Sequence, residues 1–193
     1  MEKRNVLFVM SSLRNGGAER SLVNLLQLLD YDRYNVDLLL FQNEGMFLKQ
    51  VPKAVNIISN CNKLYTLYDN NKAEALKHPY LSAIHMIGTF ISRKKTNSVA
   101  KSRQYRWEHF YKKIVPELTK EYDVAIAYMQ REQTYFLVDK VKAAKKIAWV
   151  HNEYSQLGHF KEMDLEYFEK VDKVVTISDL CAKDLKKNFP SIA

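Results

Sequence analysis

Residues 5–26, NVLFVMSSLRNGGAERSLVNLL, contain the change of pattern that decides the fold. The run Asn5–Met10 is short, apolar and partly β-branched, which is typical of a strand buried on both faces. From Ala18 the apolar residues recur at helical spacing, with polar residues between them. This stretch therefore predicts a strand, a glycine-containing loop and a helix, in that order.

The same alternation continues along the chain. Further strands are predicted at Asn35–Phe41, Val55–Ile58, Asp123–Tyr128, Lys146–Val150 and Lys173–Ile177. Helical sequence is predicted at Met46–Val51, from about Tyr80, at Ser98–Glu121, at Tyr135–Val141 and at Asp179–Phe189. Because strands separated by helices need crossover connections, the predicted fold class is α/β: a doubly wound, mostly parallel sheet with helices on both faces.

Length and composition fit one globular unit, residues 1–193, in which 47% of the residues are hydrophobic. Cys61 and Cys181 lie far apart and form no CxxC pair, so we expect a reducing compartment rather than a disulfide or metal knuckle. The N-terminal apolar run Val6–Met10 is too short for a signal peptide or a membrane span. We therefore expect a cytoplasmic protein.

The positive charge is concentrated in one segment. Arg93–Lys113 has eight basic residues and one acidic residue, a net charge of +7 out of +8 for the whole chain. Apolar sequence precedes this segment and aromatic residues interrupt it, a pattern that could lie on anionic lipid headgroups. The alternative is a long helix with solvated lysines outside and aromatics inside. No helix-turn-helix, RRM or zinc-finger spacing accompanies the charge, so we expect no nucleic-acid partner.

The loops after the strands are the places to look for ligand contacts, because doubly wound sheets bind ligands at the carboxyl ends of their strands. Gly16 and Gly17 stand directly before a predicted helix and could let a phosphate approach the helix N-terminus. They match neither GxGxxG nor GxxxxGK[ST], and a turn that needs positive φ would also explain them.

Two further loops contain chemically useful side chains. Arg131 lies in the polar stretch Met129–Thr134 and could grip an anionic or hydroxylated ligand, or could simply be solvated. His151 follows the fifth predicted strand, where it could bond a sugar hydroxyl or transfer a proton, or could be a structural histidine bonded to backbone. The hydroxyl and carboxylate groups of Thr176–Asp179 are explained by helix capping.

Two kinds of site have little support. The remaining histidines have no HxH or HExxH spacing, so no metal is expected; they are His78, His85, His109 and His159. No GxSxG nucleophile elbow is present, which weakens a hydrolase interpretation.

Four stretches together resemble the N-terminal half of a family 4 glycosyltransferase of the GT-B fold. They are NVLFVMSSLRNGGAERSLVNLL (5–26), YDVAIAYMQREQTYFL (122–137), KKIAWVHNEY (145–154) and VDKVVTISDLCAKDLKKNFP (171–190). They occur in the expected order and extend over nearly the whole chain, from residue 5 to residue 190. The resemblance implies a Rossmann-like, acceptor-side domain, half of an enzyme that transfers a sugar from a nucleotide-sugar donor with retention of configuration and without a metal or other cofactor.

The resemblance also implies roles for individual residues. Gly16 and Gly17 would lie under the donor diphosphate, and His151 would be the catalytic histidine that contacts the transferred sugar. Acceptor-side candidates on the same rim are Asn15, Glu19, Arg131 and Glu132. Asn152 follows His151 where a carboxylate partner would be, so a strongly basic histidine is not expected.

The expected function is therefore sugar transfer from a nucleotide sugar to a saccharide or lipid-linked saccharide acceptor, in bacterial surface polysaccharide synthesis at the inner membrane face. The nucleotide-binding domain with its E-x7-E motif would follow Ala193, so residues 1–193 alone should be inactive. The alternatives are a non-catalytic sugar- or nucleotide-binding module and, less favoured, a basic nucleic-acid-binding protein.

Overall fold

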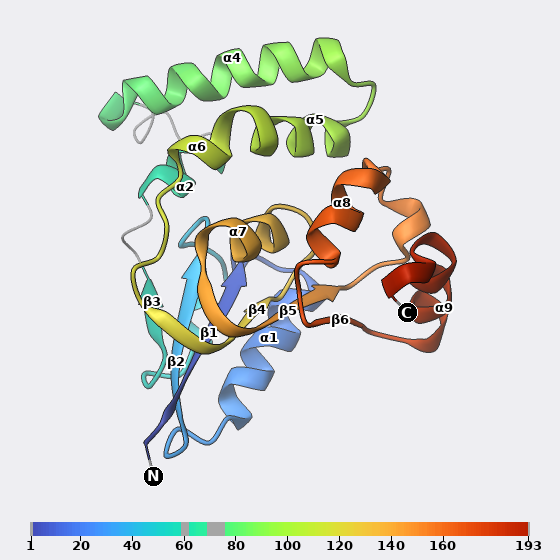
Figure 1. The fold of residues 1–193 in the computed structure, drawn as a ribbon. Helices are drawn as coiled ribbons and strands as arrows, with labels where there is room; N and C mark the ends of the chain where they lie inside the picture. The colour runs from blue at the N-terminus through green and yellow to red at the C-terminus, as the bar shows by residue number, and fades with distance from the viewer. Residues whose placement is uncertain (1, 59–61, 69–75, 193) are drawn as a thin grey trace.

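The computed structural model describes residues 2–58, 62–68 and 76–192 and contains a six-stranded, entirely parallel sheet (Figure 1). The strand order is β3-β2-β1-β4-β5-β6. The strands are β1 (Arg4–Met10), β2 (Tyr34–Leu40), β3 (Asn56–Ile58), β4 (Glu121–Ala127), β5 (Lys142–Val150) and β6 (Lys173–Thr176). Each strand overlaps its predicted range, so the predicted α/β, doubly wound class is confirmed, and the order is that of a Rossmann-like sheet.

Helices follow every strand except β2, which is joined to β3 through a 3₁₀ turn. They are α1 (Gly17–Leu28), α2 (Asn62–Tyr68), α4 (Pro79–Lys95), α5 (Val99–Arg106), α6 (Lys112–Ile114), α7 (Glu132–Lys140), α8 (Lys161–Phe168) and α9 (Asp179–Asn188). Short 3₁₀ turns lie at Leu48–Gln50, Tyr154–Gln156 and Pro190–Ile192. No helix in the described ranges is long and apolar enough to cross a membrane.

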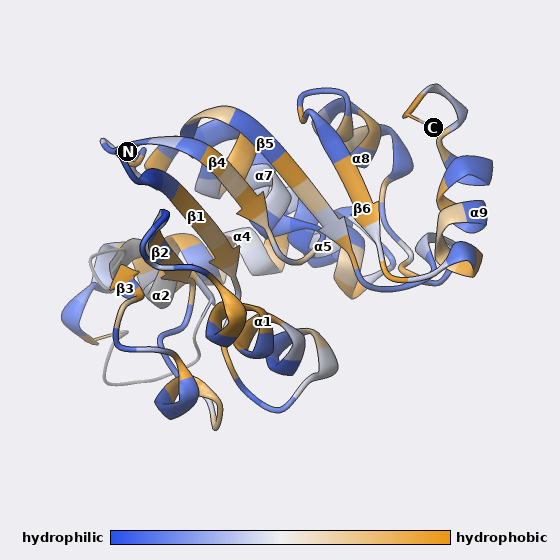
Figure 2. Cartoon of the chain, turned by 90° about the horizontal axis from the view of Figure 1, so that it is seen from below, coloured by the Kyte–Doolittle hydropathy of each residue, from blue (hydrophilic) through white to orange (hydrophobic). Residues whose placement is uncertain are grey.

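The central strands β1 and β2 are buried on both faces over most of their length, as the apolar run at the start of the chain predicts. Successive side chains of β1 point to opposite faces: Leu7 and Val9 pack in the cluster that includes α2 and α7, whereas Phe8 packs in the cluster that includes α1. Figure 2 shows largely apolar stretches in β1 and β4, with α7 behind the sheet. The sheet is therefore a rigid support for the loops at its edge.

The predicted helix Ser98–Glu121 ends earlier than expected. After α5 the chain makes a π-helical turn at Trp107–Tyr111 and one short helical turn at α6, and the helix stops at Ile114. Val115 is extended (φ −72°, ψ 126°) because a residue before proline, here Pro116, is disfavoured in the α conformation. The chain then returns to the sheet at β4.

Residues 79–114, called the helical layer below, lie above the sheet with α4 outermost (Figure 1). A buried polar network holds this layer in place. The side chain of Gln104 on α5 is fully buried; its Nε2 donates to Asp164 Oδ1 on α8 (3.1 Å), and its Oε1 accepts from the backbone N–H of Phe160 (2.5 Å). Tyr135 of α7 also donates to Asp164. These contacts fix the rotation of α5 and hence the direction of its arginines.

Two shorter predictions need correction. The predicted helix Met46–Val51 is only a 3₁₀ turn at Leu48–Gln50, because Gly45 before it has φ +130°. A Cβ at Gly45 would collide with the carbonyl of Leu13, so glycine is required there for close packing of two loops. Helix α7 begins at Glu132 rather than Tyr135, so half of the polar stretch after β4 is helical.

Cys181 is buried and free, and Cys61 lies outside the described residues.

Candidate functional site at the carboxyl edge of the sheet

The order of the strands reverses between β1 and β4, and a cavity of about 400 Å³ lies where their carboxyl ends meet. Such a reversal is the usual ligand position in doubly wound sheets, because the loops on its two sides diverge. The lining residues are Ser11, Ser12, Arg14, Glu19, Phe41, Gln42, Tyr68, Arg103, Met129, Arg131, Glu132 and Gln133. Three of the residues predicted for the site, Glu19, Arg131 and Glu132, are therefore brought to one cavity.

The paired glycines are not explained by a strained turn. Gly16 has φ −88°, and Gly17 begins α1 without positive φ. A Cβ at Gly16 would collide with the Glu19 carboxylate, whereas a Cβ at Gly17 would meet nothing within 4 Å. Gly17 thus leaves open space at the first turn of a helix, where backbone N–H groups favour anions.

A chain of contacts links the start of α1 to His151. Ser21, one turn after Gly17, hydrogen-bonds the hydroxyl of Tyr128 (3.0 Å), and the Tyr128 ring lies 5.1 Å from the His151 ring. Trp149 packs on both rings, at 4.7 Å from Tyr128 and 5.9 Å from His151. The paired glycines and the predicted catalytic histidine therefore belong to one region of the sheet edge.

His151 lies beside the aromatic rings of Tyr128 and Trp149, in a setting that favours the neutral imidazole. Burial lowers its pKa, and a hydrogen bond to the backbone of Tyr128 opposes this only in part. This lowering of the pKa agrees with the expectation that His151 is not strongly basic. Its Nε2 is buried and has no hydrogen-bond partner among the described residues, a deficit that buried polar groups rarely carry.

Two neighbouring residues carry the same deficit. The backbone N–H of His151 donates to Gln130 Oε1 (3.2 Å), while Nε2 of Gln130 is buried without a partner in the described chain. Arg131 has φ +74° and ψ −128°, and no other non-glycine residue of the described ranges has positive φ. Its Nε is also buried and unpartnered within these ranges. Backbone strain and unmet polar groups of this kind concentrate at ligand sites.

Glu132 lies differently from the other candidates. Its side chain is only 1% exposed and forms an ion pair with the Arg103 guanidinium from α5. The Arg103 charge, assisted by Arg131 and a hydrogen bond, outweighs the effect of burial, so the pKa of Glu132 lies below its ordinary value. Glu132 is therefore ionised, and its carboxylate is engaged within the protein by Arg103.

The remaining predicted residues are easily placed. Asn15 is exposed in the loop before Gly16, outside the cavity lining. Ser178 caps α9 by accepting from the backbone N–H of Cys181 (3.2 Å), which confirms the capping interpretation. In the part of the chain that the structure describes, no three His, Cys, Asp or Glu side chains gather as a metal site would require.

Sequence reasoning missed the supporting residues Tyr128, Gln130 and Arg103. Tyr128 and Gln130 occupy the same post-strand loop as Arg131, so their position after β4 was a usable signal. Arg103 has no such signal, because its partner Glu132 is 29 residues away and the pairing of α5 with α7 is a tertiary contact.

The strand order and the cavity define the class of this protein as a parallel α/β domain of the Rossmann-like type. The sequence matches no protein-family model and no curated protein.

Proposed function

We propose that residues 1–193 form the acceptor-side domain of a retaining glycosyltransferase. It would take a nucleotide sugar as donor and a saccharide or lipid-linked saccharide as acceptor, in surface polysaccharide synthesis. The observation that carries the proposal is the set of buried groups without partners around the sheet edge: His151 Nε2, Arg131 Nε and Gln130 Nε2. Sugar hydroxyls are suitable partners because each both donates and accepts hydrogen bonds.

The chemistry divides between two parts of the edge. The open space at Gly17 suits a donor diphosphate, whose charge the N-terminus of α1 stabilises. The neutral imidazole of His151 suits a hydroxyl of the transferred sugar. In the transfer, the bond from the sugar C1 to the donor phosphate breaks and a bond to the acceptor oxygen forms, while the acceptor proton passes to the departing phosphate. His151 acts by positioning and by hydrogen bonding in the transition state.

We further propose, from the resemblance, a second, nucleotide-binding domain with an E-x7-E motif. Residues 1–193 would not catalyse sugar transfer without it. Activity is therefore measured on a protein that has both domains. We expect His151→Ala to lower kcat by about 10²- to 10³-fold, the range seen when one transition-state hydrogen bond is removed. His109→Ala, on the exposed side of the helical layer, is the matched control and should retain activity.

Near-normal turnover by the His151→Ala protein would remove the histidine from the reaction. A two-domain protein that binds a nucleotide sugar without consuming it or transferring it to any acceptor would instead support the alternative, a non-catalytic sugar- or nucleotide-binding module. Steeply salt-dependent binding to arbitrary DNA would support the nucleic-acid alternative.

We also propose that α4 contacts an anionic membrane surface. Its outward face is an apolar stripe at helical spacing, and the exposed side chains include Tyr80 (69%), Met86 (70%), Ile87 (55%) and Phe90 (61%). Exposed cations follow in the last turn, and Lys94 lies 4.3 Å over the Phe90 ring. An apolar stripe beside lysines is the arrangement expected of a helix that lies in a lipid interface.

Vesicle co-sedimentation tests the membrane contact. Replacing Ile87 and Phe90 by serine should weaken binding to phosphatidylglycerol vesicles at least about tenfold, since each side chain loses its apolar burial. Leu28→Ser is the matched control, because Leu28 is equally apolar and 84% exposed on α1. Equal binding by both variants would exclude α4 as the contact.

A further inference from the structure

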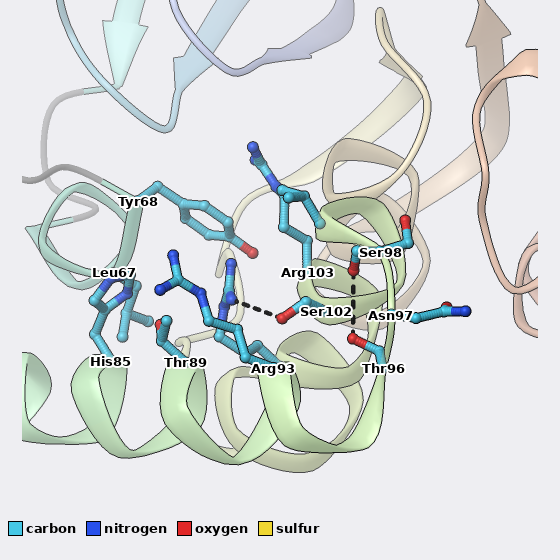
Figure 3. A pocket seen from close by; sticks show the side chains of 12 residues that line it. Leu67, Tyr68, His85, Thr89, Arg93, Thr96, Asn97, Ser98, Ser102 and Arg103 are labelled. Carbon is cyan, nitrogen blue, oxygen red and sulfur yellow. Dashed lines mark hydrogen bonds between the residues drawn. The ribbon is translucent and has the colours of Figure 1, made fainter.

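A second cavity, of about 440 Å³, lies between α2, α4 and α5 (Figure 3). Its lining residues are Leu67, Tyr68, His85, Thr89, Arg93, Thr96, Asn97, Ser98, Val99, Ser102, Arg103 and Arg106. Figure 3 shows Tyr68 from α2 and Arg93 from α4 pointing into the same space. Its three arginines belong to the basic segment, which is therefore not a single outward-facing stripe.

The cavity carries excess positive charge. None of its lining residues is acidic. Arg103 is neutralised by Glu132 from the neighbouring site, but neither Arg93 nor Arg106 forms a salt bridge with a carboxylate of the described residues. Within the described residues, the guanidinium groups of Arg93 and Arg106 have no carboxylate partner, and together they match the charge of one dianion.

Polar groups without partners lie beside these charges. The Tyr68 hydroxyl, the Thr89 hydroxyl and Arg106 Nε are buried and unpartnered in the described structure. Arg106 Nη1 donates long hydrogen bonds to the hydroxyls of Ser92 (3.4 Å) and Ser102 (3.3 Å), and the Arg106 side chain also hydrogen-bonds Tyr111. Burial above all raises the pKa of Tyr68, so its hydroxyl stays protonated as a donor. Buried donors of this kind need an acceptor that the fold does not supply.

We propose that this cavity binds a phosphate or diphosphate monoester, held by Arg93 and Arg106 with the hydroxyls of Tyr68 and Thr89. Guanidinium groups recognise phosphate oxygens through paired, charge-assisted hydrogen bonds, and the hydroxyls satisfy the remaining oxygens. The phosphate could belong to a lipid headgroup or to a free molecule. The second cavity shares Tyr68 and Arg103 with the cavity at the sheet edge, but Arg93, Arg106 and Thr89 line only the second one, and the proposal stands whether or not sugar transfer takes place at the edge.

Calorimetric titration of the full chain with inorganic pyrophosphate, at constant ionic strength, tests the site. Arg93→Gln and Arg106→Gln should each weaken binding about tenfold or more, because each removes a charge-assisted hydrogen bond. Lys95→Gln and Lys113→Gln remove the same charge from exposed positions outside the lining and should change the affinity less than twofold. The thermal unfolding midpoint checks that each variant folds. If Arg106→Gln does not fold, the test depends on two other variants. Arg93→Gln changes a more exposed residue, and Thr89→Val removes a hydroxyl without changing the charge; each should weaken pyrophosphate binding.

Two comparisons separate this site from the sheet edge and identify the source of the phosphate. Gly17→Ala alters only the space at the start of α1, so a loss of pyrophosphate affinity in this variant that Arg93→Gln and Arg106→Gln do not share would place the anion at the sheet edge instead. Farnesyl diphosphate in non-ionic micelles is compared with farnesol in the same micelles. Binding of farnesyl diphosphate alone points to a lipid-borne phosphate, and equal binding of pyrophosphate points to the phosphate itself. If neither binds, or if Arg93→Gln and Arg106→Gln bind like the unaltered protein, the proposal is wrong.

Discussion

The carboxyl edge of the sheet and the helical layer both hold polar groups without partners, but they are built differently. At the edge, Gln130, Arg131 and His151 follow the ends of β4 and β5, whose parallel register fixes their separation. In the layer, Arg93 and Arg106 come from α4 and α5, and α5 is fixed by one buried polar network. A ladder of backbone hydrogen bonds is distributed over many residues, whereas the network depends on a few side chains.

The charges of the two regions differ as well. Arg131 at the edge shares its surroundings with Glu19 and Glu132, while the arginines of the second cavity have no acidic neighbour in its lining. The edge therefore suits hydroxyl-rich ligands, and the layer suits a compact anion. The two cavities share Tyr68 and Arg103, so they can be perturbed separately only by residues that belong to one of them.

The largest stability change is expected for Asp164→Ala. Asp164 accepts hydrogen bonds from Gln104, Tyr135, Tyr154 and His159. Removing it leaves buried donors unpaired and should cost about 3–5 kcal/mol of unfolding free energy, measured by urea denaturation. Glu162→Ala, on the exposed side of the same helix, should change little.

The same variant tests whether the helical layer depends on the buried polar network while the sheet does not. Amide hydrogen exchange of the Asp164→Ala protein should accelerate more in α5 than in β4, because Gln104 belongs to α5. Equal acceleration in both elements would contradict the idea that the network holds the layer independently of the sheet.

Gly45→Ala should disturb the edge and spare the layer. A Cβ there meets the Leu13 carbonyl and the residue has φ +130°, so we expect a loss of about 1–3 kcal/mol in thermal or urea unfolding. Gly88→Ala is the counterpart in α4, where a Cβ would lie 3.4 Å from the movable Phe110 ring. A similar loss of unfolding free energy in Gly45→Ala and Gly88→Ala would mean that backbone strain at glycine does not distinguish the sheet edge from the helical layer.

Asp37 on β2 contacts Lys120 and Tyr122, at the point where the chain returns from the helical layer to the sheet at β4. Burial alone would raise its pKa, but hydrogen bonds from Asn56, Lys120 and Tyr122 outweigh burial, so the pKa lies below its ordinary value. Its stabilisation is therefore complete above the unfolded-state pKa of about 3.9 and is lost as pH falls through the folded value.

We expect Asp37→Asn to lower the free energy of unfolding by about 1–2 kcal/mol at pH 7, since it weakens charge-assisted hydrogen bonds. The difference from the unaltered protein should shrink as the pH falls below 4, as followed by urea unfolding at several pH values. A difference that is constant from pH 7 to pH 3 would show that the carboxylate charge is not what stabilises this junction.

Most of the sheet could be predicted from the sequence, whereas little of the second cavity could be. The strands are legible because each is a short apolar run, and the rule that ligands bind at carboxyl ends then leads to Arg131 and His151. The strain at Arg131 has no sequence signal, because its φ results from how the loop joins α7. The sequence predicts for the basic segment either a lipid-facing surface or a helix with solvated lysines, and neither includes a buried arginine, since periodicity does not show that Arg103 pairs with Glu132.

Gly17→Ala should give the smallest change in stability, with the opposite sign. The new Cβ meets no atom within 4 Å and alanine favours a helix, so unfolding should become harder by about 0.5–1 kcal/mol. In the two-domain protein the same methyl group would occupy the space proposed for the donor diphosphate and raise the KM for the nucleotide sugar about tenfold or more. A destabilised protein would contradict the geometry at Gly17. A stabilised protein with unchanged KM would instead mean that the diphosphate lies elsewhere, because only a ligand can make that open space costly to fill.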